Sequence, residues 1–357
     1  MAKFVNITAN DTILTTTKVT KGLFTGDVGT ITGASLSTSS LSTTQKAYYY
    51  TLQMSGEDQF SVTYGHRAGS GSGDEGTNTF GKTRAIYKQF ASMLLPFNEV
   101  ETGFVINSVS QSDCYFIQFE RARMKDRVNR KNWTLHLSGS AGSAAGGTGA
   151  ANFTGSILKL TDDSNISASG HSPVGPVYNI VSGSSGKVAN NTPYGLFYPN
   201  VGVLVLSPTR LSSSLPGSPA YINSGSKIHS THQMHVGLGS DPRVDGNADN
   251  PGKLVNSILL SNQLTYRSEE DQTSATYFCR ARAPEFNFSN NPTFVTGSVG
   301  ENRNEFRIPE MEGDPQVFIT TVGLYDANDH LMAVGKLSSP ILKNYGSEAT
   351  IKVKLTY

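Results

Sequence analysis

Charged residues are scarce in this chain of 357 residues. Asp, Glu, Lys and Arg together make up 16% of it, and the formal net charge is only +1. In an average globular domain about a quarter of the residues are charged. A nearly neutral chain has no overall electrostatic attraction for nucleic-acid phosphates or anionic lipid surfaces. We therefore expect neither nucleic acid nor a membrane among its partners.

The chain also has no long apolar run. No segment approaches the ~18 to 20 apolar residues that a membrane-spanning helix needs, and Met1–Ile7 lacks the long apolar run of a signal peptide. The only two cysteines, Cys114 and Cys279, each lie within an expected strand. Buried free thiols made in a reducing compartment are the favoured interpretation, and a disulfide between them stays open.

Small and polar residues take the place of the missing charged and apolar ones. The chain contains 36 glycines, and Ser, Thr and Asn, which are typical of turns and β-structure, are abundant. This composition predicts a mainly β protein with antiparallel, sandwich-like sheets, long loops and one or two short helices. Because long loops are commonly functional or ordered by a neighbour, it also favours an oligomeric subunit of an assembly.

Local patterns predict a hairpin and one clear helix. Two β-rich runs, Tyr48–Leu52 and Gln59–Tyr64, flank a polar turn at Ser55–Asp58. Apolar residues recur with helical spacing in Arg84–Leu95, and Pro96 ends the pattern. We therefore expect a hairpin over the first region and a helix at residues 84–95.

Two further strands are expected to differ in exposure. Cys114–Phe119 is mostly apolar on both faces, as in a central strand, whereas Trp133–Ser138 alternates, as on a sheet with one wet face. Weaker patterns predict strands at 156–161, 177–181, 201–206 and 275–282 and a short helix at 253–260.

The C-terminal residues carry the strongest strand signal. Val317–Tyr325 and His330–Leu337 predict paired strands around an Asp/Asn turn, and a last strand is expected at Thr350–Tyr357. The apolar residues of the last strand share one face: Ile351, Val353, Leu355 and Tyr357. We expect this face to pack against residues 316–337 and complete an antiparallel meander.

These elements group into four segments. Residues 1–44 form an extended N-terminal segment with one expected strand at Lys3–Thr8, and residues 45–206 form a β-rich domain that contains the helix. Residues 207–250 are rich in Pro, Ser, Gly and Asn and indicate a long loop insertion. Residues 251–357 form the C-terminal meander, expected to pack on the first domain.

Two glycine patterns precede the expected helix. Gly71–Gly76 matches a dinucleotide-binding fingerprint, but the helix begins too late for that site. Gly76–Thr83 matches a phosphate-binding loop, in which Lys82 would reach phosphates and Thr83 a magnesium ion. The neighbouring elements are hairpins and not alternating strands and helices, so a structural loop is favoured and a nucleotide site remains the alternative.

Metal and catalytic motifs are weak. His229, His232 and His235 are three residues apart, a spacing that does not put three rings on one face of a helix or strand. Asp245–Asp249 resembles the start of a calcium loop but lacks its later glycine and glutamate. There is no G-x-S-x-G, H-E-x-x-H or C-x-x-C motif. We therefore expect no enzyme activity and no cofactor, and an ion at the histidines stays open.

Basic residues crowd the connection between two expected strands. The cluster consists of Arg121, Arg123, Lys125, Arg127, Arg130 and Lys131. Alternation of its first four members suggests one strand edge that faces solvent or a partner. Docking to an acidic neighbour is the favoured interpretation. A plain solvated hairpin and nucleic-acid binding are the alternatives.

Five phrases of the chain, spread from residue 47 to the end, carry a family resemblance: Phe60–Ser72, Arg84–Phe90, Gly195–Leu206, Phe286–Phe294 and the terminal hairpin. They resemble structural proteins of T-even-like myoviruses, including those of marine cyanobacteria. The resemblance implies a virion component of the contractile tail or baseplate, assembled in the host cytoplasm, with other virion proteins as partners.

A head-decoration, neck or receptor-binding (tail-fibre-associated) module is the alternative. A receptor-binding module should expose aromatic rings in loops, and the candidates for such rings are Tyr194, Phe197 and Tyr198.

Overall fold

The chain divides into two compact units. The computed structural model describes residues 4–39, 48–69, 82–141, 152–214, 250–259, 261, 263–289, 291–296 and 305–357. Unit 1 comprises Met1–Lys18 and Asp271–Tyr357, and unit 2 comprises Val19–Glu270. The chain passes between them within strands β1 (Thr12–Gly22) and β17 (Arg267–Ala281). Unit 2 is therefore inserted into the sequence of unit 1, and these boundaries differ from those expected at residues 44, 206 and 250.

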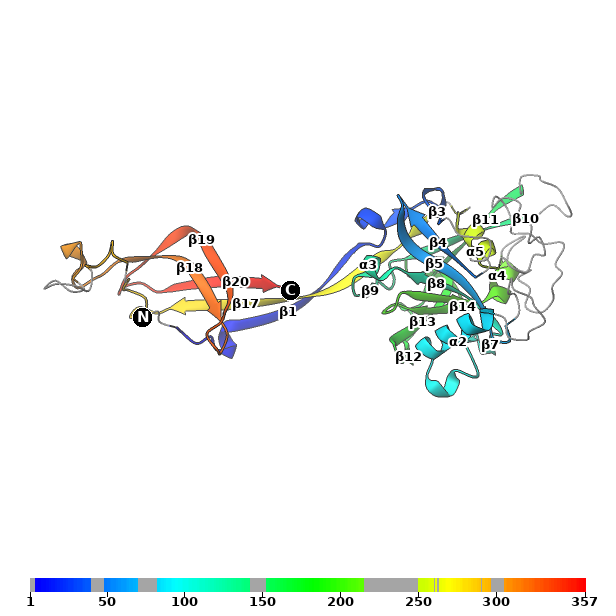
Figure 1. Ribbon diagram of the computed structural model, residues 1–357, viewed down its shortest axis with the longest axis horizontal. Coiled ribbons are helices and arrows are strands. Elements are labelled where there is room, and N and C mark those ends of the chain that lie inside the picture. Colours follow the sequence, from blue (N-terminus) through cyan, green and yellow to red (C-terminus); the bar gives the residue numbers. More distant parts are fainter. Residues whose placement is uncertain are drawn as a thin grey trace. The chain divides into compact units, whose positions relative to one another are not determined.

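The fold is mainly β and antiparallel, as predicted (Figure 1). One twelve-stranded sheet organises unit 2. Along its main path the order is β2 (Thr30–Ile31), β16 (Leu264–Thr265), β10 (Thr134–Ala141), β11 (Asn152–Asp162), β13 (Gly175–Ser184), β14 (Lys187–Tyr198), β15 (Val203–Leu206), β8 (Asp113–Phe119), β5 (Glu57–His66), β4 (Tyr49–Met54) and β3 (Ser37–Thr38). Strand β12 (Gly170–Ser172) pairs with β13 off this path.

Strand β8 lies in the middle of this sheet and is buried on both faces, as its sequence predicts. Successive side chains of a strand point to opposite faces. Tyr115 and Ile117 accordingly belong to one hydrophobic cluster, and Phe116 belongs to a second. Helix α2 (Lys82–Leu94), close to its predicted bounds, covers the second face, where Phe90 stacks on Phe116 with ring centroids 4.1 Å apart.

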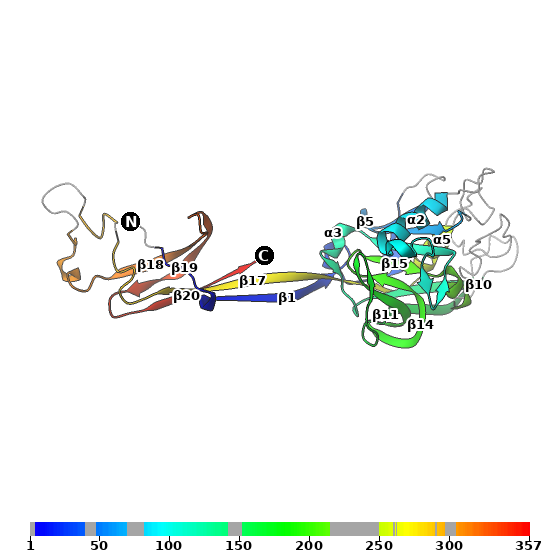
Figure 2. The same cartoon turned by 90° about the horizontal axis from the view of Figure 1, so that it is seen from below.

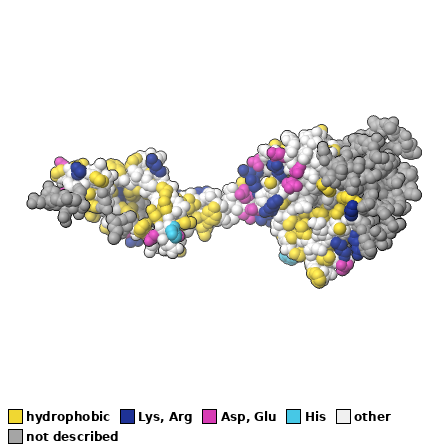
Figure 3. Space-filling view, in the orientation of Figure 1, with side chains coloured by type: hydrophobic (Ala, Val, Ile, Leu, Met, Phe, Trp, Pro, Cys, Tyr) yellow, Lys and Arg dark blue, Asp and Glu magenta, His cyan; other side chains and the backbone are white. Residues whose placement is uncertain are grey.

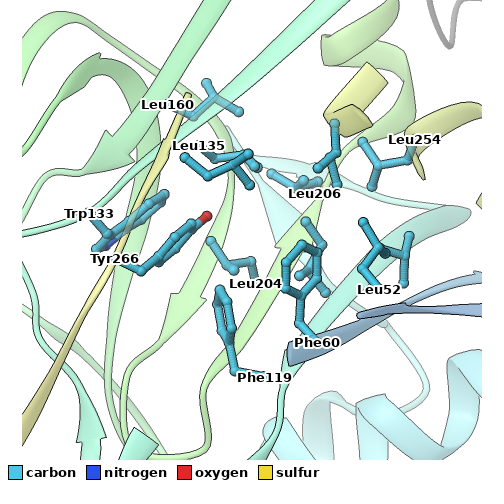
Figure 4. Packing of buried hydrophobic residues seen from close by; sticks show 14 of the residues in the cluster. Leu52, Phe60, Phe119, Trp133, Leu135, Leu160, Leu204, Leu206, Leu254 and Tyr266 are labelled. Atoms are coloured by element: carbon cyan, nitrogen blue, oxygen red, sulfur yellow. The ribbon is translucent and has the colours of Figure 1, made fainter. Parts of the chain in front are cut away.

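The first cluster is enclosed by the sheet itself. Leu52 of β4 and Leu135 of β10 come from opposite ends of the strand order and join the same cluster (Figure 4). Helix α5 (Asn250–Leu259) packs against β10 and against β4 and β5. The ring of Trp133 stacks on Tyr266, with centroids 5.6 Å apart and planes 6° apart. The sheet thus curves around one aromatic-rich core in a sandwich-like arrangement.

Two local expectations for unit 2 are wrong in detail. Ser55 and Gly56 alone form the hairpin turn, with positive φ of 54° and 80°, so the predicted turn residues Glu57 and Asp58 already belong to β5. The expected wet face of residues 133–138 is buried, since Thr134, His136 and Ser138 are all at most 5% exposed. Thr134 Oγ1 finds a partner inside, since it accepts a hydrogen bond from the Ser185 amide at 2.9 Å.

The remaining elements of unit 2 are short. They are the helices α3 (Arg121–Met124) and α4 (Pro208–Ser214), the hairpin of β6 (Val105–Ile106) and β7 (Val109–Ser110), and strand β9 (Arg127–Val128). The expected loop at 207–250 begins with α4 and runs into α5, and its residues 215–249 lie outside the described part of the chain. No helix among the described residues is long and apolar enough to span a membrane.

Unit 1 contains two small antiparallel sheets. In one, β17 lies between β1 and β20 (Ala349–Thr356), and the other is the hairpin of β18 (Val317–Tyr325) and β19 (Leu331–Lys343). Figures 1 and 2 show the hairpin beside the sheet that contains β20.

The prediction that the last strand completes a C-terminal meander is wrong. Strand β20 pairs with β17, with Ile351 opposite Cys279, and not with β19. Only Ile351 of its four apolar residues is buried, while Tyr357 is 73% exposed. The expected first strand is also wrong, because residues 4–8 are irregular and Ala9–Asp11 form a short 3₁₀ turn.

A matched pair on β8 tests the two-sided core. Ile117→Ala should lower the free energy of unfolding by about 2 to 5 kcal/mol, because it leaves a cavity in a packed cluster. Gln118→Ala, at the next and exposed position, should change it by less than about 0.5 kcal/mol. Urea unfolding followed by the fluorescence of Trp133, the single tryptophan, measures both in unit 2. Equal losses would contradict the packing described.

Candidate interaction surfaces

The basic connection, residues Glu120–Lys131, is not an extended strand edge as predicted. Its first residues form α3, a single helical turn, and Lys125 then adopts a positive φ of 61°. Met124 is buried at the end of this turn, and a Cβ added at Gly202 would lie only 1.8 Å from its sulfur. Burial of Met124 thus anchors the turn, so the basic side chains do not alternate along one edge.

One member of the cluster has a structural role. Arg127 Nε lies 2.8 Å from the Glu269 carboxylate, which is buried and also accepts a hydrogen bond from Asn129 Nδ2 at 2.8 Å. Strand β9 pairs with β17 at this point, Arg127 opposite Glu269. A buried carboxylate needs such partners because desolvation disfavours its charge. Arg127 therefore holds β9 to β17.

Arg123 is paired near the surface. Its guanidinium forms an ion pair with Glu57, which also accepts a hydrogen bond from Thr25 Oγ1 at 3.0 Å. The Thr25 hydrogen bond, together with Arg123, lowers the pKa of the Glu57 carboxyl. The open depression around this pair contains the carboxylates of Glu57, Asp58 and Glu120 beside Arg123. This depression is therefore not a basic anion site.

The other four cations of the cluster are exposed. Arg121 donates to the backbone oxygen of Asp126 at 2.8 Å, and Arg130 donates to the hydroxyl of Tyr178. Lys125 and Lys131 extend the exposed group. Figure 3 shows Lys and Arg side chains mixed with Asp and Glu on the visible face of unit 2. Docking of this group to an acidic neighbour stays a prediction.

Most other candidate sites from the sequence lie outside the described residues. These are Gly71–Gly76, residues 76–81 of the phosphate-loop match, the three histidines at 229, 232 and 235, and Asp245–Asp249. The end of the phosphate-loop match is described: Thr83 is fully buried, and Lys82 Nζ lies 5.0 Å from the ring centroid of Tyr48. Among the described residues, no three His, Cys, Asp or Glu side chains could together hold a metal ion.

Two buried titratable groups of unit 2, Tyr64 and Asp113, form a hydrogen bond. Tyr64 donates its hydroxyl hydrogen to Asp113 at 3.0 Å, and burial raises the pKa of the Asp113 carboxyl. Cys114 is fully buried, and desolvation raises the pKa of its thiol, which opposes formation of a nucleophilic thiolate. Cys114 and Cys279 are both free, as predicted. Tyr64, Asp113 and Cys114 are therefore packed within the sheet of unit 2.

The aromatic residues proposed for a receptor-binding loop are core residues. Phe197 and Tyr198 are at most 1% exposed, and Tyr194 packs partly buried against the first cluster. They belong to the β14–β15 hairpin in the middle of the sheet. The expectation that they form exposed rings is therefore wrong.

The largest exposed apolar group lies in unit 1, and sequence reasoning missed it. Sixteen of the 22 exposed large hydrophobic residues in the described chain belong to this unit. We call them the apolar surface of unit 1: Phe4, Val5, Ile7, Ile13, Leu14, Phe286, Phe288, Ile308, Phe318, Tyr325, Leu331, Met332, Val334, Leu342, Tyr345 and Tyr357. None of the described residues of unit 1 joins either hydrophobic cluster. Figure 3 shows such side chains at the surface of this unit.

A signal for this surface is present in the sequence. The alternation of a half-buried strand leaves one face polar, but Val317, Phe318 and Ile319 are consecutive apolar residues in a hairpin strand. Ile13 and Leu14 form a similar pair in β1. Apolar residues of both parities in strands at a sheet margin indicate that both faces need covering.

Comparison with known proteins adds no relative. No family model, curated protein or solved structure matches the chain. The functional argument accordingly depends on the residues of this chain.

Two arginines of the basic connection should behave differently on substitution. Arg127→Ser should lower the free energy of unfolding by about 2 kcal/mol or more, because it leaves the buried Glu269 without its ion pair. Arg123→Ser should cost little, since exposed ion pairs contribute little. Adding Glu269→Gln to Arg127→Ser should restore part of the loss by removing the unpaired charge. Small and equal losses in urea unfolding would show that Arg127 is also only a surface residue.

Proposed function

We propose that this chain is a structural component of a tailed-phage virion, in the contractile tail or baseplate. It acts through protein–protein interfaces, without catalysis and without a cofactor. Its partners are other virion structural proteins, and it is assembled in the host cytoplasm. The observation that carries the proposal is the apolar surface of unit 1.

The physical reason is the mismatch between composition and burial in unit 1. Monomeric soluble proteins rarely expose contiguous apolar patches larger than a few hundred Å², and larger ones mark interaction sites. A two-stranded hairpin such as β18–β19 is at best marginally stable alone in water. A subunit that completes its structure by packing against neighbours resolves both problems, which is how a building block of a particle functions.

The resemblance to myovirus structural proteins is the reason why we propose a phage virion as the assembly. Its phrases fall on elements that build unit 2, such as Arg84–Phe90 on α2 and Gly195–Leu206 on the β14–β15 hairpin. They also include Phe286–Phe294 and the terminal hairpin in unit 1. The resemblance therefore concerns both units and supports a shared role in the virion.

One observation favours the receptor-binding alternative. Phe288, Phe294 and Phe306 form an edge-to-face cluster, with the centroids of Phe294 and Phe306 5.5 Å apart. Phe288 is about half exposed, so the cluster offers an aromatic platform. Such a platform could stack on a ligand at a tail tip.

Localisation on particles tests the proposal. Antibodies raised against the purified chain should label the tail or baseplate of virions of the encoding phage in immunogold electron microscopy, because a structural component remains in the particle. Labelling confined to fibre tips would favour the receptor-binding alternative. Finding the chain by mass spectrometry in the lysate but not in purified virions would refute a structural role.

The absence of catalysis is tested directly on the purified chain. Incubation with nucleotides, peptides or polysaccharides should give no turnover, because Thr83 of the phosphate-loop match is buried and no nucleophile motif is present in the sequence. Lys82→Ala is the diagnostic variant for a nucleotide. Nucleotide hydrolysis that this variant abolishes would show that the loop is a working site.

A further inference from the structure

One face of the hairpin of unit 1 is exposed and carries large apolar side chains. Phe318 pairs across the hairpin with Leu342, and the two side chains are 64% and 45% exposed. Tyr325 pairs with Leu331, and these are 46% and 52% exposed. Register irregularities in the hairpin follow Ile319 and Leu324, and the exposed positions of β18 change accordingly from 318 and 320 to 321, 323 and 325. Phe318 and Tyr325 therefore belong to the exposed face, which presents apolar side chains to solvent, whereas Val322 is half-buried and Leu324 is buried on the other face.

Large apolar side chains are also exposed in the N-terminal part of unit 1. Ile13 and Leu14 are neighbours in β1, so they point to opposite faces of its sheet, and both are exposed. Phe4 packs edge-on against Tyr325, with ring centroids 4.9 Å apart, and is still 54% exposed. The apolar surface thus continues from the hairpin to the N-terminal segment.

Polar contacts hold much of the described part of unit 1. Lys343, at the end of β19, is buried and donates three hydrogen bonds, to Asn287 Oδ1 at 2.7 Å and to the backbone oxygens of Ala283 and Asn344. Its buried apolar residues are few, among them Leu324 and Ile351. The described part of the unit therefore has little apolar core, which leaves its large side chains available to a partner.

The apolar surface is large enough for an obligate interface. If about half of a side chain of ~150 Å² is exposed at each of the sixteen positions, the exposed apolar area is on the order of 1,200 Å². Covering this area on two copies would bury roughly 2,400 Å² in total, divided among the faces on which these residues lie, and permanent oligomers bury areas in this range.

The character of the surface indicates which partner covers it. Residues 1–18 and 271–357 contain ten Lys and Arg and eleven Asp and Glu, so copies of unit 1 would not repel one another. Because unit 1 is nearly neutral, it also has no charged surface that would complement a strongly charged partner. A partner must match the apolar side chains on the exposed face of this sheet. Unit 1 of another copy provides such a surface, with the same extent and strand geometry.

We infer that unit 1 is a homo-oligomerisation module, in which the β18–β19 hairpin and the N-terminal segment of one copy pack against unit 1 of further copies. This inference deepens the proposed function, since it names the first partner of a subunit that works by assembly. Unit 2, which contains both hydrophobic clusters, needs no such cover.

The full-length chain tests this by light scattering coupled to size exclusion and by sedimentation velocity. The wild type should have the mass of a discrete oligomer at micromolar concentration. Phe318→Asp should raise the dissociation constant by about tenfold or more, because a charge then enters a desolvated interface. The matched control is Phe97→Asp, which puts the same charge on an aromatic residue of unit 2 that is 97% exposed. It should stay oligomeric.

A milder variant guards against misfolding. Leu342→Ser, across the hairpin from Phe318, should also weaken association, while the circular dichroism and the Trp133 fluorescence of both variants stay those of the wild type. A wild type that is monomeric over the whole concentration range would overturn the inference, and so would equal weakening by Phe97→Asp. Oligomer formation only after another virion protein is added would assign the surface to that protein.

The two proposals can fail separately. A chain that is oligomeric in solution but absent from virions would refute the virion role and leave the inference standing. A chain that is monomeric in solution but incorporated into virions would refute the inference and leave the virion role standing.

Discussion

Unit 2 depends on the burial of both faces of its central strands. Side chains of β8 and β15 alternate between the two hydrophobic clusters, with Leu204 in one and Val205 in the other. A sheet of this kind needs cover on both sides. Helix α2 covers one face, and the curvature of the sheet, with α5 and the Trp133–Tyr266 stack, closes the other. The basic connection and its ion pairs are positioned by this core.

Unit 1 follows the opposite rule. Its strands are as regular as those of unit 2, but their large side chains are mostly exposed and a buried lysine is part of what joins its segments. Hydrophobic burial is the main favourable contribution to folding. A unit with so little burial of its own gains this contribution only when something covers it. In the proposed assembly, the core of unit 2 supplies stability and unit 1 supplies the contact with other copies.

Local patterns predicted the elements that local chemistry determines. The β4–β5 hairpin, α2, β8 and β18 were all expected near their observed positions, because turn residues and periodicity act within one segment. Partners distant in sequence could not be inferred in the same way. β20 pairs with β17 from about 70 residues away, which no periodicity encodes. The role of Arg127 was missed because its partner, Glu269, is 142 residues further along the chain.

The insertion of unit 2 into unit 1 has a consequence for synthesis. Thr15 of β1 meets Ser274 of β17 across 259 residues of sequence. β1 cannot pair with β17 until the ribosome has made residues 267–281, whereas unit 2 is complete at residue 270 and can fold as it emerges. Closing so long a loop is cheaper once its interior is compact. The apolar side chains of unit 1 are therefore arranged after unit 2, so the proposed association would begin only once a folded unit 2 is attached to each copy.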